Sequence, residues 1–382
     1  MIGQRGLSRR EFLRTSGMAS IGLQVEGLCP ALESRPSCIS TSDLAFVGVM
    51  GETPGILVYT RADDGWCPKQ VIACDAPVSL ALHPEGGTLY VLQELSEWEG
   101  LPRGSIETFR IETGTGKLTS LGRQGLSLSA ILPRRLAVSP EGRCLAVAVY
   151  GGGAYNILPI QEDRGLGRAT SIMKEVGCGP VMPHQASAHP HTVVFDPRGR
   201  MIASDMSCDR LTVFSRGDGL KTLSRYELPP GSGPQSIALH PSGTLLYVVN
   251  ALSGSITGMR YDAEEGSIAE QLVQVGGSDG EALTLHPSGD FLYASEGNVI
   301  RAWRIEAVTG NLMEVGQSHW KTSTVHEMAA PPEGRSLIAV ASDGILEIEI
   351  DPVTGSPGRT INVARVAAPR CIALSRTEGK TV

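Results

Sequence analysis

Short runs in which apolar and polar positions alternate recur along most of the chain. In each unit one apolar run leads into a tight turn built on Pro and Gly, and a second apolar run follows. The turn prolines are Pro84, Pro140, Pro197, Pro241, Pro287 and Pro332. Apolar side chains at every second position suit a strand with one buried face, and Pro and Gly supply the dihedral angles of a tight turn. Each unit therefore predicts an antiparallel hairpin.

The spacing of these hairpins indicates a repeat. Successive turn prolines lie 56, 57, 44, 46 and 45 residues apart, and a truncated seventh copy opens at Pro369. A second kind of turn, rich in Gly, Asp, Glu and Thr, falls between the copies and adds another hairpin to each unit. Seven units of four strands predict an all-β fold, a seven-bladed β-propeller with four-stranded blades.

The order of the two turns predicts how the ring closes. The chain begins with the second kind of turn, at Gly65, and ends with a strand of the first kind, so neither end supplies a whole blade. We expect the strand 371–375 to join strands near 44–50 and 56–60 in one blade, which removes an exposed sheet edge. The propeller would then occupy residues 41–382 as a single domain.

Residues 1–40 do not fit the repeat. The segment Ser8-Arg9-Arg10-Glu11-Phe12-Leu13-Arg14 resembles a twin-arginine export signal, and a short apolar stretch follows it. We expect a leader that sends the protein to the periplasm or out of the cell. The alternative is an ordinary basic N-terminus and a cytoplasmic protein, because Gln24 and Glu26 interrupt the apolar stretch and no Ala-x-Ala cleavage site follows.

Charge and cysteine content narrow the range of partners. The formal net charge is −7, and without residues 1–40 it is −9, from 28 basic and 37 acidic side chains. That balance argues against nucleic acid or an anionic membrane surface as partner, and no apolar run is long enough to span a bilayer. The eight cysteines include no C-x-x-C pair, and their disulfide pairing cannot be assigned. We expect a monomer that binds a small molecule.

The repeat also predicts where a site would lie. The innermost strands of a propeller begin at one height around the central channel, so one repeat position yields a ring of side chains at one mouth. Six residues before each turn proline, or at the matching place in the last copy, stand Val78, Arg134, His191, Gln235, Glu281, His326 and Arg370. The following strand returns to the same face, where Glu94, Asp205, Asp209, Arg210, Glu296 and Asp343 lie. Histidine, arginine and carboxylate groups together are typical of a polar ligand site with acid/base capacity, although a solvated mouth also collects polar residues.

The histidines fall into two groups. His83, His240 and His286 each precede a turn proline, and we expect them to be structural. His184, His189 and His191 lie in the longest departure from the repeat, 177–197. Three histidines near Asp205 raise the question of a metal. Pro190 interrupts them and no ligand spacing is recognisable, so we expect neither metal nor cofactor.

This segment carries a resemblance to a known family. Gly177-x-Gly179-Pro180, His189-x-His191-x-Val193 and Asp205-x-x-x-Asp209-Arg210 are similar to the signature of the seven-bladed lactonases, which include propeller-type 6-phosphogluconolactonases and fungal carboxymuconate cyclases. The resemblance implies a lactone opened by water without a metal. By position it implies that His191 is the general acid or base, that Arg210 binds the substrate's carboxylate or phosphate, and that Asp209 orients Arg210.

The remaining polar groups of the mouth are predicted to bind substrate: His189, His326, Glu281, Gln235, Arg134, Arg370, Glu94 and Asp205. Departures from the family pattern occur at Gln235, Ala251 and Glu296, where relatives carry Arg, Glu and Asn-Arg. Losing two arginines weakens the case for a phosphorylated substrate, since bidentate contacts hold such groups.

The leading hypothesis is an exported lactonase for a small sugar lactone. The alternatives are a non-catalytic binding propeller and, less favoured, a metal- or quinone-dependent oxidoreductase.

Overall fold

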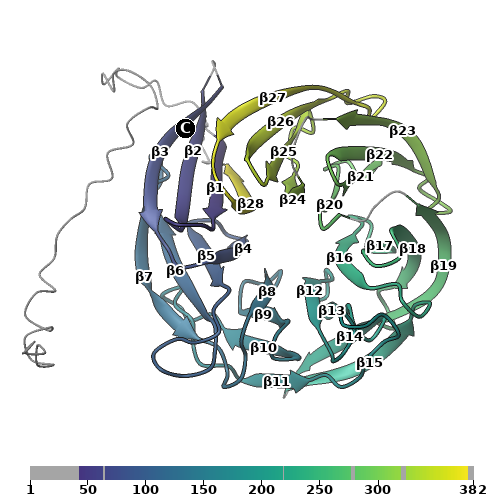
Figure 1. Ribbon diagram of the computed structural model, residues 1–382, viewed down its shortest axis with the longest axis horizontal. Coiled ribbons are helices and arrows are strands. Elements are labelled where there is room, and N and C mark those ends of the chain that lie inside the picture. Colours follow the sequence, from purple (N-terminus) through teal and green to yellow (C-terminus); the bar gives the residue numbers. More distant parts are fainter. Residues whose placement is uncertain (1–42, 63–64, 218, 277–279, 320–323, 377–382) are drawn as a thin grey trace, which may run out of the picture. The chain divides into compact units, whose positions relative to one another are not determined.

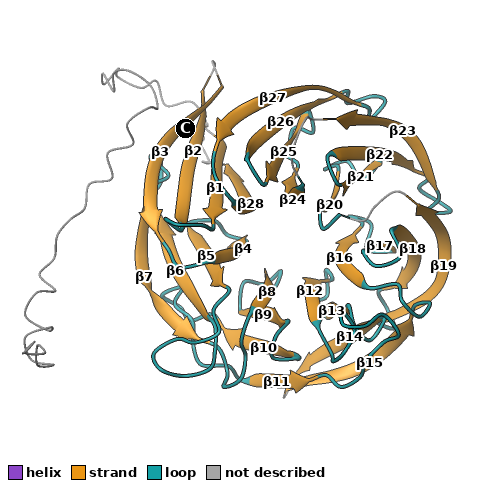
Figure 2. Ribbon diagram, in the orientation of Figure 1, coloured by secondary structure: helices purple, strands orange, loops and turns teal. Residues whose placement is uncertain are grey.

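The computed structural model describes residues 43–62, 65–217, 219–276, 280–319 and 324–376. In this part of the chain 28 strands form seven antiparallel sheets of four, arranged around a central axis, and no helix is present (Figure 1, Figure 2). The predicted seven-bladed propeller is confirmed. The twin-arginine segment predicted at residues 8–14 lies outside the described residues.

The strands fall into four radial layers. The innermost are β4 (Pro77–Leu82), β8 (Pro133–Val138), β12 (Pro190–Phe195), β16 (Pro234–Leu239), β20 (Leu283–Leu285), β24 (Val325–Ala329) and β28 (Pro369–Arg376). The second layer holds β1 (Asp43–Val49), β5 (Thr88–Gln93), β9 (Cys144–Val149), β13 (Met201–Asp205), β17 (Leu245–Asn250), β21 (Phe291–Glu296) and β25 (Ser336–Ala341). The third holds β2 (Gly55–Ala62), β6 (Ser105–Ile111), β10 (Ala154–Pro159), β14 (Arg210–Gly217), β18 (Ser255–Asp262), β22 (Val299–Ile305) and β26 (Gly344–Ile350). The outermost are β3 (Gly65–Ala73), β7 (Leu118–Gly125), β11 (Ser171–Lys174), β15 (Gly219–Glu227), β19 (Ser267–Gly276), β23 (Leu312–His319) and β27 (Pro357–Arg365).

The hydrophobic core lies between neighbouring blades. All six residues of β5, β9, β17 and β25 are buried, so the second layer is covered on both faces. Phe46 of one blade, for example, belongs to the same apolar cluster as Val91 and Phe109 of the next. The outermost strands consist mainly of exposed and half-buried residues, and in β11 the two classes alternate residue by residue, as in a strand with one wet face. Burial on both faces explains why the second-layer sequences read as continuous apolar runs.

The ring closes as predicted, by pairing of the chain's two ends. β28 runs antiparallel to β1, with Phe46 opposite Ala373 and Gly48 opposite Cys371. Gly48 is required there, since a Cβ atom would lie 2.4 Å from Cys371 Sγ and 3.1 Å from Pro77 Cβ. The order β28-β1-β2-β3 makes one complete blade from both ends of the propeller.

The three histidines that precede turn prolines join neighbouring blades. Nε2 of His286 donates to the Gly334 carbonyl of the next blade at 2.8 Å, while Nδ1 accepts the Ser288 N–H at 3.2 Å. Accepting at Nδ1 and donating at Nε2 requires the neutral Nε2–H tautomer. His83 and His240 reach Gly142 and Gly289 in the same way, each at 3.0 Å. The prediction that these residues are structural is confirmed.

The partner glycines explain the turn sequence. Gly334 has φ +67°, and a Cβ atom on it would lie 2.2 Å from His286 Nε2. The glycine thus meets two demands at once: a backbone conformation that other residues adopt at a cost, and room for the imidazole of the preceding blade. The recurring His-Pro-x-Gly therefore encodes a contact between blades as well as a turn within one.

Replacing His286 by Ala should lower the free energy of unfolding by about 1–3 kcal/mol, because it removes the inter-blade hydrogen bond and leaves a buried carbonyl without its donor. Thermal and urea unfolding of His286→Ala measures the loss. His184→Ala is the matched control, since His184 is exposed and its removal should change stability by less than about 0.5 kcal/mol. Equal stability of the two variants would contradict the inter-blade role.

Candidate functional site

A β-bulge shapes the start of the innermost strands. In β8 the ladder passes from Pro133, opposite Val149, to Arg135, opposite Ala148, so Arg134 is left out of the pairing. The same shift occurs at the first residues of β4, β12, β16, β24 and β28. A bulge redirects side chains and breaks the alternation of faces. Two consecutive residues at the start of an innermost strand can therefore both reach the channel.

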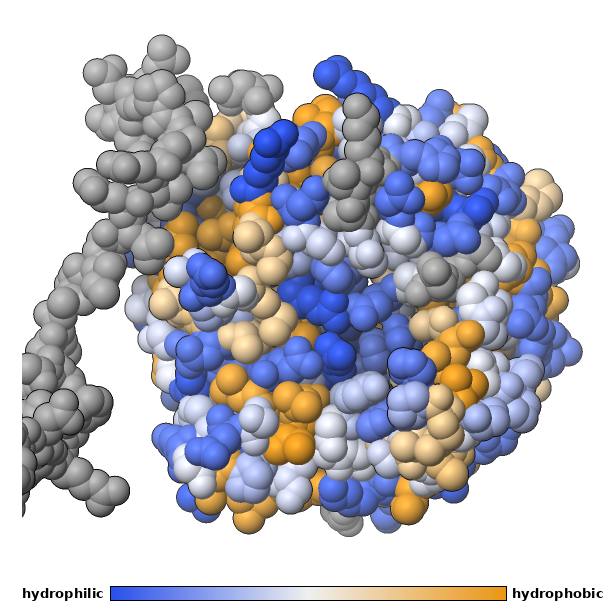
Figure 3. Space-filling model, in the orientation of Figure 1, coloured by the Kyte–Doolittle hydropathy of each residue, from blue (hydrophilic) through white to orange (hydrophobic). Residues whose placement is uncertain are grey.

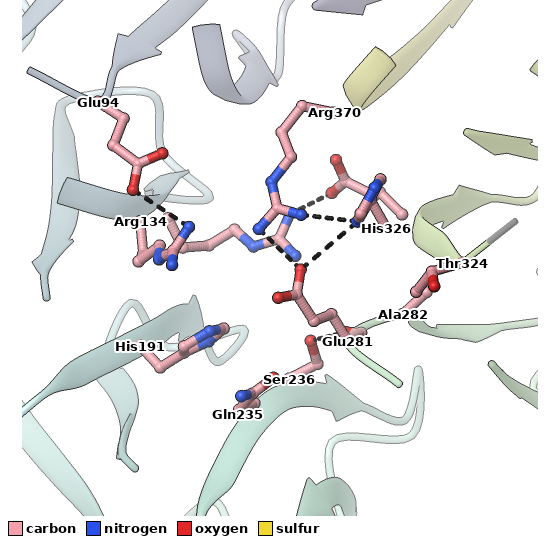
Figure 4. A network of polar contacts seen from close by, with 12 residues as sticks. Glu94, Arg134, His191, Gln235, Ser236, Glu281, Ala282, Thr324, His326 and Arg370 are labelled. Atoms are coloured by element: carbon pink, nitrogen blue, oxygen red, sulfur yellow. Dashed lines mark hydrogen bonds and ion pairs between the residues drawn. The ribbon is translucent and has the colours of Figure 1, made fainter. Parts of the chain in front are cut away.

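The predicted ring of side chains forms at one mouth of the channel. Figure 3 shows a hollow at the centre of the propeller with hydrophilic residues around it. In Figure 4 the side chains of Glu94, Arg134, His191, Gln235, Glu281, His326 and Arg370 converge on one space. The structure thus brings together seven of the eleven residues predicted for the site.

Two ion pairs lie at this mouth (Figure 4). Arg134 Nη1 lies 3.1 Å from Glu94 Oε1, and Arg370 Nη2 lies 2.8 Å from Glu281 Oε2. These side chains are half-buried, with exposed fractions between 17% and 31%. Charge-assisted hydrogen bonds of this kind are stronger than neutral ones and hold their partners in fixed geometry.

His326 completes the second pair. Arg370 donates to its Nδ1 at 2.7 Å, and its Nε2 lies 3.0 Å from Ser342 Oγ. Burial, and then the charge of Arg370, lower the pKa of His326, while Glu281 acts in the opposite direction. An imidazole that accepts a hydrogen bond from a guanidinium is neutral. The 4.0 Å approach of His326 Nδ1 to Glu281 is therefore not an ion pair.

A third pair, between Arg135 and Glu327, spans the channel and was missed by the sequence analysis. Arg135 Nη1 contacts Glu327 Oε1, although β8 and β24 lie on opposite sides of the central space (Figure 1). Glu327 Oε2 also accepts the backbone N–H of Ile372 in β28 at 3.1 Å. In a regular strand, neighbouring side chains point to opposite faces, so Arg135 and Glu327 would point away from the side to which Arg134 and His326 point. The bulges at Arg134 and His326 interrupt this alternation, and Arg135 and Glu327 line the channel.

The channel holds a cavity of about 400 Å³ along the innermost strands. Arg135 and Glu327 line it together with small or apolar side chains, among them Ser79, Thr192 and Ala282.

Among the described residues no three His, Cys, Asp or Glu side chains come together as metal ligands would. The described part of the chain also contains no helix that could span a membrane.

His191 is buried in the mouth, with 7% of its surface exposed. Tyr150, after β9, meets it edge-on at 6.3 Å between ring centroids, and the Arg134 guanidinium lies over the same tyrosine ring. Burial, and then the positive charges of Arg134, Arg135 and Arg370, hold the pKa of His191 well below its usual value. The imidazole is consequently neutral at pH 7. No described residue hydrogen-bonds to its Nε2.

His189 and Asp205 build the scaffold of the mouth. The His189 ring stacks on Tyr150, with centroids 4.2 Å apart, and its Nδ1 lies 3.1 Å from the Tyr150 carbonyl. Asp205 is 1% exposed, and its Oδ1 accepts the backbone N–H groups of His189, Ser207 and Cys208, each at 3.0 Å. The substrate contact predicted for Asp205 is thus replaced by a structural one.

Arg210 lies away from the ring, which corrects the role predicted for it. It begins β14, in the third layer, and its guanidinium pairs with Glu175 and reaches the carbonyl of Val176, both after the outermost strand β11 of the neighbouring blade. Glu175 is almost fully buried, and burial raises its pKa although Arg210 acts to lower it. The pair joins two blades, and the arginines whose charges lower the pKa of His191 are Arg134, Arg135 and Arg370.

The prediction that Asp209 orients Arg210 is also wrong. Asp209 Oδ1 accepts the Gln185 amide and the Gly233 N–H, each at 2.8 Å, and Oδ2 accepts the Gly231 N–H at 2.7 Å. With φ +49° and 5% exposure, Asp209 fixes the loops between two blades. The role predicted for Asp209 came from the family resemblance, and the hydrogen bonds of Asp209 assign it a structural role instead.

Two positions that depart from the family pattern have different surroundings. Gln235 lies in the ring, where its Nε2 approaches Met206 Sδ at 3.4 Å and its buried Oε1 has no hydrogen-bond partner among the described residues. Glu296 pairs with Arg301 at 2.6 Å, at the end of β21. Gln235 therefore places a neutral amide at the mouth in place of a cation.

Known proteins with related sequences or folds agree with this architecture. A probable 6-phosphogluconolactonase of Arthroderma benhamiae is 26% identical over 297 residues, 71% of this chain and 73% of that protein. A 6-phosphogluconolactonase of Bacillus subtilis is 27% identical over 205 residues, 53% of this chain but only 56% of that relative's length. The solved structure of a periplasmic gluconolactonase of Pseudomonas aeruginosa superposes with a TM-score of 0.79 at 26% identity, covering 88% of this chain and 99% of that one.

The family model described as "Lactonase, 7-bladed beta-propeller" matches residues 55–374. That match begins with β2 and ends within β28, so it includes all seven members of the ring. Together with the sheet order and the mouth of converging side chains, it shows that the chain belongs to the seven-bladed β-propeller lactonase family.

Proposed function

We propose that the protein hydrolyses a small sugar lactone at the mouth lined by Arg134, His191 and Arg370. The observation that carries the proposal is a buried imidazole held neutral by burial and by the guanidinium groups around it. A base that stays unprotonated near neutral pH and has an unoccupied nitrogen is suited to activate water. Membership of a lactonase family and relatives named gluconolactonase and 6-phosphogluconolactonase support the same reaction.

The groups of the mouth can carry out each proton transfer of this reaction. Water adds its oxygen to the lactone carbonyl carbon while Nε2 of His191 takes a proton from it. A guanidinium group has five N–H donors. Arg134 and Arg370 can therefore keep their pairs with Glu94 and Glu281 and still donate to the carbonyl oxygen, where they stabilise the negative charge that develops. The ring C–O bond then breaks, the leaving oxygen receives the proton from His191, and the product is an open-chain hydroxy acid. The arrangement needs no group beyond these side chains and water.

Export through the twin-arginine pathway is part of this proposal. It rests on the motif around Arg9 and Arg10, and the Pseudomonas aeruginosa relative, described as periplasmic, is consistent with it. Fractionation of cells that express the full chain tests the point. Replacement of both arginines by lysine should retain the protein in the cytoplasm, whereas an unchanged distribution would contradict export by this route.

Replacing His191 by Ala should lower kcat by about 10²- to 10⁴-fold, because general base catalysis contributes a factor of that size. Lactone hydrolysis by the purified protein, followed as acid release in weakly buffered solution, measures the change. His184→Ala is the control, since it alters an exposed histidine of the same segment. Unchanged activity in His191→Ala would leave the non-catalytic binding propeller as the better description.

The pH dependence of kcat/KM should show an acid limb well below the usual histidine pKa of 6.5. A lowered pKa means that His191 remains unprotonated, and hence active as a base, as the pH falls through 6.5, and it loses activity only near its own depressed pKa. The same shift makes folding less favourable below pH 6.5, where the unfolded chain binds a proton that the folded site excludes. Initial rates corrected for spontaneous hydrolysis give the profile. An acid limb at 6.5 or above would show that another group acts as the base.

A further inference from the structure

We infer that the mouth selects an uncharged sugar lactone over the phosphorylated form of the same lactone. The inference rests on the proposed function, because it names the substrate class of that site. It follows from the state of the arginines at the mouth: in the described part of the chain, each of them is already paired with a carboxylate of the protein.

The three pairs balance in charge. Arg134 pairs with Glu94 at 3.1 Å, Arg370 with Glu281 at 2.8 Å, and Arg135 with Glu327 across the channel. Three guanidinium groups thus face three carboxylates, and the six groups together carry no net charge. His191 and His326 add none, since both are neutral. The contacts of the three arginines therefore describe a mouth without net charge.

A phosphate group would have to break these pairs. A phosphate monoester carries a charge of about −1.5 to −2 at neutral pH and is held best by bidentate arginine contacts. Turning Arg370 to such a group would separate it from Glu281 and leave that carboxylate close to the incoming dianion. The Arg134–Glu94 pair presents the same obstacle. Moreover, Arg135 cannot turn away without leaving Glu327 unpaired inside the channel, which is costly for a buried charge.

A polyhydroxylated lactone fits the same surface without breaking any pair. A hydroxyl group donates one hydrogen bond and accepts others, so it can bridge a carboxylate oxygen and a guanidinium N–H that lie side by side.

The test compares glucono-δ-lactone with its 6-phosphate in the purified protein. We expect kcat/KM to favour the uncharged lactone by about ten- to a hundredfold, the factor that corresponds to the loss of one or more charge-assisted hydrogen bonds. Glu281→Gln and Glu94→Gln each release one arginine from its carboxylate. Either variant should shift the ratio of the two kcat/KM values toward the phosphorylated substrate by about tenfold or more.

Glu85→Gln is the matched control. Glu85 also pairs with an arginine, Arg164, but it lies beyond the other end of β4 from the mouth. The substitution changes the net charge by the same amount and breaks an arginine–glutamate pair at the surface, where the Glu85 side chain is 71% exposed. An effect of overall charge would therefore appear in it as well. We expect the substrate ratio of Glu85→Gln to equal that of the unsubstituted protein.

Binding of the corresponding lactams, which carry an amide in place of the ester, separates this inference from the proposed function. Tighter binding of the uncharged lactam without hydrolysis of either lactone would overturn the proposed function and support the inference. Higher kcat/KM for the 6-phosphate, or tighter binding of its lactam, would overturn the inference and leave the hydrolase intact. Binding of neither lactam together with hydrolysis of neither lactone would overturn both. A substrate ratio unchanged in Glu281→Gln and Glu94→Gln would show that these pairs do not set the selectivity.

Discussion

The antiparallel pairing of β28 with β1 is the interaction on which the rest of the structure depends. Without it the first blade would lack its innermost strand, and the sheet edge of β1 would be left unpaired. The same strand carries Arg370 into the mouth and gives the N–H of Ile372 to Glu327. Closure of the ring and assembly of the site therefore depend on the same strand, because β28 completes the closing blade and also carries Arg370.

Closure also requires each blade to pack on its neighbours at a constant height. The inter-blade hydrogen bonds of His83, His240 and His286 provide that at the turns. The Arg210–Glu175 pair and the Asp209 hydrogen bonds tie the blade of β12, β13, β14 and β15 to the blades on either side of it. Residues that resemble a catalytic signature thus hold blades in place here, and the catalytic groups of the proposed reaction lie nearer the axis.

Much of the mouth could be predicted because a propeller repeats its geometry. The ring members, among them Val78, Arg134 and His191, share one repeat position. Equivalent positions of the repeat lie at the same height along the channel axis. Arg135, Glu327 and Tyr150 could not be found that way. The first two lie on the wrong face until a bulge turns them, and Tyr150 reaches His191 and His189 from the end of a second-layer strand in another blade.

The sequence by itself determined the fold, the number of blades, the closing strand and the identity of the ring, since all of these follow from local patterns repeated along the chain. Only the tertiary structure decided which charges meet. Arg210 binds Glu175 and not its neighbour Asp209, and Arg135 crosses the channel to a residue 192 positions away. The physical reason is that strand periodicity is a local property of the chain, whereas an ion pair depends on distances across the ring.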